Sequence, residues 1–244
     1  MPHARPIYFQ AETGAAAPVQ QTPDQAAAVD GRGAFAPARV NVTSERVLRV
    51  LGYPAGRQIR PAILNAAESM AEVANRVGTP EVRYRRLAIE RIDDDGTLRL
   101  AGGVQFRSQA FNAHLAGAGD VVLFVLTLGK GLDLVSANLN AAGNLMEAVM
   151  LESAAWMAIE HATKDFARFL VAQVADEELA LTRRMAPGYG FHIGGQRLEW
   201  PLEQQAELFA ALGPGPLPVQ VLESGAMTPK MSRSGLWGLR RRDA

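Results

Sequence analysis

Apolar residues recur at helical spacing in two parts of the chain. The first runs from about Pro61 to Val77, where proline lies in the first turn and Gly78 follows the end. The second covers 131–179, and Gly143 and Asn144 divide it into a short helix and a long one. We expect the long helix to bury a stripe made of Leu145, Val149, Trp156, Ile159, Phe166, Phe169 and Leu170.

Strand patterns lie between the two helical regions. Apolar and charged residues alternate through much of 81–106, and Asp95-Gly96 is a strong hairpin signal. A short helix over 108–115 leads to 121–126, a continuous apolar run typical of a strand that is covered on both faces. These segments predict antiparallel strands around one buried central strand.

The two ends of the chain differ in character. Residues 1–38 are rich in Ala, Pro, Gln and Gly without periodicity, which predicts a disordered N-terminal arm and a folded domain over 39–244. That domain is expected to begin with a short strand and a helix capped by Thr43 or Ser44. Towards the C-terminus we expect a helix over 202–212 and strands over 218–224 and 234–242. Because helices and strands interleave irregularly, the predicted class is α+β, with a mixed, largely antiparallel sheet and flanking helices.

Composition narrows the function classes. Lys plus Arg equals Asp plus Glu, 25 each, so no overall field favours nucleic acid or a membrane surface as a partner. The chain has no cysteine, which excludes disulfides and thiolate chemistry. We see no secretory signal and no apolar run long enough to span a bilayer, so the expected location is cytoplasmic.

Common catalytic motifs are missing from the sequence. The run Thr127-Leu128-Gly129-Lys130-Gly131 lacks the spacing of a phosphate-binding loop. No histidine has a ligand spacing such as H-E-x-x-H, and no serine lies in G-x-S-x-G. We therefore predict no metal site and identify no catalytic residue from these motifs.

One loop carries the main chemical signal. In "RRMAPGYG", Arg184 offers a planar fork suited to a carboxylate, Gly188 permits close backbone approach, and Tyr189 offers a ring face with a polar tip. Together they suit a small zwitterionic ligand. The same residues would also make a plain tight turn, with Arg184 in a surface ion pair and Tyr189 packed.

Larger blocks resemble a known family. Arg184-x-x-x-Gly188-Tyr189 resembles the R-x-x-x-G-Y-P signature of the S-adenosylmethionine-binding reactivation domain of cobalamin-dependent methionine synthase. Downstream, "WPLEQQAELFAAL" and "VQVLESGAMTPKMSRSGLWGL" resemble the helix and the L-T-E-S-x-x-M-x-P-x-x-S-x-S-G stretch that follow it. Upstream, residues 120–166 look like the family's strand, threonine-x-glycine turn and long helix. The resemblance covers roughly 105–240.

The resemblance implies a methionine synthase activation domain-like fold and a stand-alone reactivation module. Such a module presents S-adenosylmethionine to cob(II)alamin, carried by a partner protein, for reductive methylation. It implies ligand binding by six consecutive residues, namely Arg184, Met185, Ala186, Pro187, Gly188 and Tyr189. Expected partners are a cobalamin-binding methyltransferase polypeptide of methionine biosynthesis and an electron donor such as a flavodoxin-like protein.

The sequence departs from the family at two places. Gly190 replaces the proline of the signature, and Glu45 is a weak candidate for the acidic residue that holds the ligand's amino group in the family. The alternative reading is therefore a non-catalytic docking module for a corrinoid protein that has lost S-adenosylmethionine binding.

Overall fold

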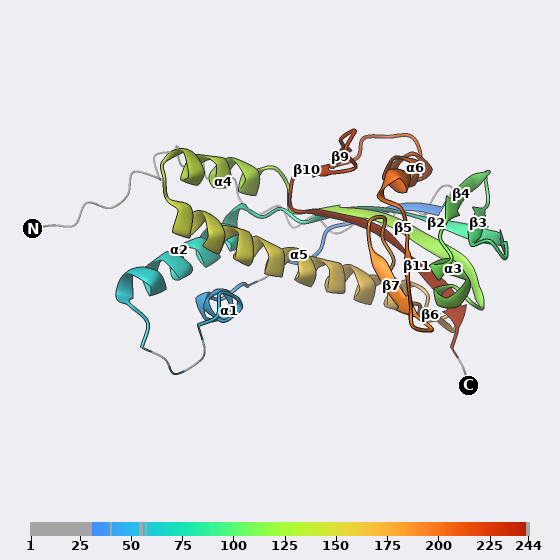
Figure 1. The fold of residues 1–244 in the computed structure, drawn as a ribbon, viewed down its shortest axis with the longest axis horizontal. Coiled ribbons are helices and arrows are strands. Elements are labelled where there is room, and N and C mark those ends of the chain that lie inside the picture. The colour runs from blue at the N-terminus through green and yellow to red at the C-terminus, as the bar shows by residue number, and fades with distance from the viewer. Residues whose placement is uncertain (1–30, 40, 54–55, 57, 243–244) are drawn as a thin grey trace, which may run out of the picture.

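The computed structural model describes residues 31–39, 41–53, 56 and 58–242 and places a seven-stranded sheet at their centre (Figure 1). The strand order is β4-β3-β2-β5-β11-β6, β1 pairs with β2, and all these pairs are antiparallel. The strands are β1 (Arg32–Phe35), β2 (Glu81–Ile92), β3 (Thr97–Leu100), β4 (Val104–Arg107), β5 (Ala118–Thr127), β6 (Leu179–Leu181) and β11 (Ser232–Arg241). The predicted α+β class with a largely antiparallel sheet is confirmed.

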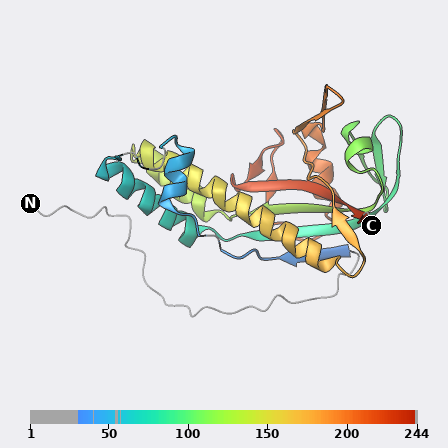
Figure 2. The same cartoon turned by 90° about the horizontal axis from the view of Figure 1, so that it is seen from below.

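Helices and small hairpins cover the two faces of the sheet (Figures 1 and 2). One face carries α5 (Leu145–Gln173), and α1 (Ser44–Val50), α2 (Pro61–Val77) and α4 (Gly131–Ala141) pack against α5 beyond the end of the strands. The other face carries α3 (Ala110–His114), the 3-10 turn η2 (Leu202–Gln204), α6 (Gln205–Ala211) and the hairpins β7 (Gly190–Ile193) with β8 (Gln196–Glu199) and β9 (Gln220–Val221) with β10 (Met227–Thr228). The sheet is thus the middle of three layers.

β5 is buried on both faces, as its unbroken apolar sequence predicts. Val121, Leu123 and Val125 belong to the cluster under α3 and α6. Their neighbours Val122, Phe124 and Leu126 belong to the cluster on the side of α5. This alternation follows from the two-residue period of a strand.

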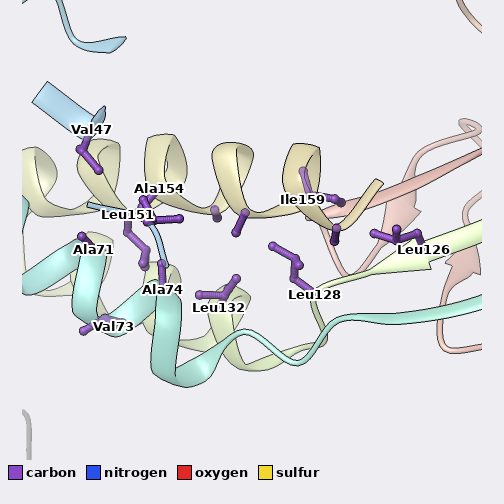
Figure 3. Close-up of a cluster of buried hydrophobic side chains, with 14 of the residues drawn as sticks. Val47, Ala71, Val73, Ala74, Leu126, Leu128, Leu132, Leu151, Ala154 and Ile159 are labelled. Carbon is purple, nitrogen blue, oxygen red and sulfur yellow. The ribbon is translucent and has the colours of Figure 1, made fainter. Parts of the chain in front are cut away.

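The helix boundaries follow the predicted signals closely. α2 starts at Pro61 and ends at Val77, and α4 and α5 separate at 142–144. Small side chains, including Ala71 and Ala74 of α2 and Ala154 of α5, lie where the two helices pack together (Figure 3). Alanine at such positions lets helix axes approach closely.

The predicted buried stripe of α5 is partly wrong. Ile159, Phe166 and Leu170 are buried and Phe169 is partly buried. By contrast, the side chains of Leu145, Val149 and Trp156 are 63%, 52% and 52% exposed. The buried face instead contains many alanines, namely Ala148, Ala154, Ala155, Ala158 and Ala162. A stripe drawn through the largest apolar residues misses them, because close packing on α2 favours the smaller side chain.

The predicted boundary at residue 39 is also wrong. Residues 32–35 form β1, whose Phe35 stacks on Phe169 with ring centroids 4.3 Å apart. The strand pairs with 82–85 of β2, so its order comes from a distant partner and not from its own sequence. Residues 1–30 of the predicted arm lie outside the described residues. The short strand expected just before Thr43 does not form at residues 39, 41 or 42.

Candidate functional site

The segment that carries Arg184 extends β6 along the edge of β11. Thr182 and Gly238 exchange hydrogen bonds of 2.9 Å, the backbone N–H of Thr182 donating to Gly238 and that of Gly238 to the Thr182 hydroxyl. Met185 and Leu236 exchange two backbone hydrogen bonds of 2.9 and 2.8 Å. The residues on both sides of Arg184 are therefore hydrogen-bonded to β11.

The loop that follows is fastened by Trp200. The backbone N–H of Gly188 donates to the carbonyl of Trp200 at 2.7 Å, and the N–H of Trp200 donates to the carbonyl of Tyr189 at 3.2 Å. Trp200 itself is fully buried, with its ring edge-on to Phe106 and Phe111. Gly188 has φ +79°, a left-handed conformation that favours glycine. The predicted loop is thus a fixed turn anchored in the core.

Gly190, which stands where the family signature has proline, begins the hairpin of β7 and β8. Its partner across the hairpin is Glu199, and the guanidinium of Arg197 lies over the glycine where a side chain would clash with it. The segment that follows the signature is therefore a two-stranded hairpin with Gly194 and Gly195 at its turn.

Arg184 lies in a cluster with more positive than negative charge. Its guanidinium carbon is 5.9 Å from the ring centre of Tyr189. Arg233 on β11 and Glu160 on α5 lie close enough to affect its titration. Glu160 is already engaged, because its Oε2 accepts a hydrogen bond from Arg233 Nη1 at 2.5 Å. Among the described residues, no carboxylate lies within ion-pair distance of Arg184, which differs from the surface ion pair of the plain-turn alternative.

The electrostatics of this cluster favour an incoming anion. Burial, and next the charge of Arg233, lowers the pKa of the Arg184 guanidinium. An arginine stays charged in proteins, so this lowering means that the cation is poorly solvated where it lies. Burial alone would raise the pKa of Glu160, but the hydrogen bond and charge of Arg233, with the charge of Arg184, lower it overall. A carboxylate placed at Arg184 would offset the excess positive charge.

The neighbouring arginine has different surroundings. Arg183 is exposed, and its guanidinium carbon lies 5.7 Å from the ring centre of Phe191 on β7. Burial, and then the charge of Arg183, lowers the pKa of His114 on α3. The two adjacent arginines therefore contact different elements, as the alternation of an extended segment predicts.

The six predicted site residues differ in exposure and in the backbone donors that they leave free. Tyr189 is 54% exposed, whereas Met185, Ala186 and Pro187 are buried, so their side chains are not open to a ligand. The N–H groups of Met185, Gly188 and Tyr189 already donate to protein carbonyls. The N–H groups of Arg184 and Ala186 have no acceptor among the described residues, so two backbone donors of the loop remain.

The chain has a fold similar to that of the MetH reactivation domain. A crystal structure of that domain bound to AdoHcy aligns with a TM-score of 0.51 and 16% identity over 88% of this chain and 80% of that one. No family model matches the chain, and no curated protein matches it. The likeness therefore concerns the fold, and the site is argued from this chain's own residues.

Two residues of the site were not predicted from sequence. Glu160 falls among charged residues that are typical of the solvated face of a helix, yet it lies beside Arg184 and Arg233. Arg233 is four residues from the buried Trp237, so the two side chains lie on the same face of β11. This spacing is the sequence signal that could have placed Arg233 on the side of α5. Glu45, the weak acidic candidate, pairs instead with Arg49 at 2.7 Å on the exposed side of α1.

The described residues were also searched for metal ligands and for membrane-spanning helices. Over those residues, no three His, Asp or Glu side chains are grouped as metal ligands. None of the helices drawn from them is both long and apolar enough to cross a bilayer.

Proposed function

We propose that the chain binds S-adenosylmethionine at Arg184 and acts as a reactivation module for a cobalamin-dependent methyltransferase. The observation that carries this proposal is the partly buried Arg184 guanidinium, which has no carboxylate partner among the described residues and adjoins Arg233 and Glu160. The support from comparison is a fold similar to a domain that was crystallised with AdoHcy.

Each part of the ligand head group has a complementary residue. The Arg184 fork suits the carboxylate, which can accept two parallel N–H donors. Glu160, while paired with Arg233, adds negative charge near the ammonium and sulfonium ends. The backbone N–H groups of Arg184 and Ala186, which have no acceptor among the described residues, can donate to a ligand oxygen. The exposed ring of Tyr189 lies beside the guanidinium, where it can contact both the ligand and the cobalamin of the partner.

The chain's own contribution is orientation. The methyl donor and the cobalamin supply the bond-making chemistry, and the protein holds one against the other. In this proposal the cobalamin is carried by a separate methyltransferase polypeptide, and a flavodoxin-like protein supplies the electron. No residue of this chain is required to exchange a proton.

Calorimetric titration with S-adenosylmethionine and AdoHcy tests the first half of the proposal. We expect saturable binding at micromolar ligand, and absence of heat at millimolar ligand would overturn it. The second half is tested by adding the chain, reductant and S-adenosylmethionine to a methyltransferase held as cob(II)alamin, with methylcobalamin followed by its absorption. A chain that binds the corrinoid protein but neither ligand would be the docking module of the alternative reading.

A further inference from the structure

We propose that Trp156 on α5 is the platform on which the purine ring of the ligand stacks. The inference rests on the proposed function, because it extends the Arg184 site to the opposite end of the same nucleoside ligand. It assigns a specificity-determining role to a residue that the loop signature does not include.

The exposure of Trp156 is unusual for the tryptophans of this chain. Trp200 is fully buried and Trp237 is 5% exposed, whereas 52% of Trp156 faces solvent. A large aromatic ring kept in water is an informative exception, since such rings gain most from burial or from stacking on a partner.

Trp156 lies on the edge of α5 that meets the β10–β11 segment. It is four residues after Glu152 and four before Glu160, so the three side chains share one helix face. Glu160 pairs with Arg233, and Glu152 pairs with Lys230. The exposed ring is therefore bracketed along the helix by two ion pairs to the same segment.

This placement suits a nucleoside with an amino-acid head. If the carboxylate lies at Arg184 and the ammonium near Glu160, the ring of Trp156 is about 6 Å further along the helix axis, at four residues of about 1.5 Å each. Stacking on an aromatic ring requires no hydrogen bond to the base. Polar groups for the purine edge lie one turn further on, where Glu152, Lys230 and Asp133 line a small hollow between α4 and α5.

The purine is the occupant that these observations favour. The charged cluster fixes where the head group lies, and Trp156 is the exposed aromatic side chain on the adjoining turn of α5. The two ion pairs hold the β10–β11 segment against the helix, so the surroundings of the Trp156 platform are formed before the ligand binds. A preformed platform of this kind loses little conformational entropy on binding.

The test compares Trp156→Ala, Trp156→Phe and the matched control Val149→Ala. Val149 is 52% exposed on the same helix, two turns before Trp156. AdoHcy, adenosine and methionine are each titrated by calorimetry. We expect Trp156→Ala to weaken AdoHcy and adenosine binding about tenfold, Trp156→Phe to weaken them less than about threefold, and Val149→Ala to leave them unchanged. Methionine, which lacks the purine, should bind all variants alike.

Tryptophan fluorescence gives a second readout. Because Trp156 is the exposed indole, AdoHcy should quench the part of the wild-type emission that comes from Trp156. In Trp156→Phe this quenching should disappear. This measurement also serves if Trp156→Ala fails to fold.

The outcomes separate this inference from the proposed function. Unchanged AdoHcy affinity in Trp156→Ala, with binding that still depends on Arg184, overturns the platform and leaves the function standing. Equal losses for methionine and adenosine would mean a structural role and also overturn it. Failure of the wild type to bind AdoHcy overturns both.

Discussion

Gly235 of β11 lies directly against the backbone carbonyl of Met185, with no room between them for a side chain. A Cβ at Gly235 would overlap that carbonyl oxygen and come within 3.3 Å of the Ala186 side chain. The glycine also has φ +151°, where other residues are strained. It therefore sets how closely the Arg184 segment approaches the sheet.

We expect Gly235→Ala to lower the free energy of unfolding by about 3 kcal/mol, since it adds both strain and a clash with backbone. The same change should weaken S-adenosylmethionine binding, because the Arg184 segment must shift. Urea unfolding and calorimetry check the two effects. The matched control is Gly119→Ala in β5, where a Cβ would meet nothing within 4 Å. Equal stability of Gly235→Ala and wild type would contradict this account of the contact.

Phe35 provides a test of the revised N-terminal boundary. Its ring stacks on Phe169 and Phe166, with centroids 4.3 and 5.8 Å apart. Because the ring is partly buried, Phe35→Ala should cost roughly 2 kcal/mol of unfolding free energy. The control Val50→Ala removes an exposed side chain and should change stability by less than about 0.5 kcal/mol. If both variants melt like the wild type, β1 does not contribute to the core.

What the sequence could predict was local. The boundaries of α2 follow from Pro61 and Gly78, and the double burial of β5 follows from its unbroken apolar run. Arg184 and Gly188 could be proposed as site residues because their chemistry lies in one short loop, and their role stays a prediction.

What could not be predicted depends on contacts between distant parts of the chain. Glu160 and Arg233 are 73 residues apart, and only the packing of α5 on β11 brings them together beside Arg184. β1 is ordered by its pairing with β2, about fifty residues later. The exposed face of α5 was misassigned because alanine contributes little to a hydrophobic pattern yet fills a close helix contact.

The Glu160–Arg233 pair predicts a pH dependence of stability. The pKa of Glu160 is lower in the folded chain than the unfolded value of about 4.3, so the ionised form is favoured by folding. Its contribution is complete above the unfolded pKa and is lost as pH falls through the folded one. Urea unfolding of wild type and Glu160→Gln between pH 3 and 7 should give a difference that is constant above about pH 5 and shrinks below it.

The control for that series is Glu45→Gln, which removes a carboxylate in an exposed pair on α1. Exposed pairs of this kind contribute little, so its difference from wild type should be small at every pH. A Glu160→Gln difference that stays flat down to pH 3 would show that ionisation of Glu160 does not stabilise the fold.

Arg184 is the residue on which ligand binding depends most. If its fork pairs with a carboxylate in this partly buried site, Arg184→Ala should weaken S-adenosylmethionine binding by roughly 2 to 4 kcal/mol. Arg184→Lys should recover only part of that loss, because lysine keeps the charge without the planar fork. Calorimetry measures both. Stability should change little, because removing the cation also removes its repulsion from Arg233.

Arg183→Ala is the matched control for this series. It removes an adjacent arginine that lies over Phe191 and not over Tyr189, so ligand affinity should stay within about twofold of wild type. The comparison distinguishes a specific fork from the general positive charge of the segment. Equal losses in Arg183→Ala and Arg184→Ala would favour general charge, because the two guanidinium groups contact different elements. Wild-type affinity in Arg184→Ala would remove the central contact of the proposed site.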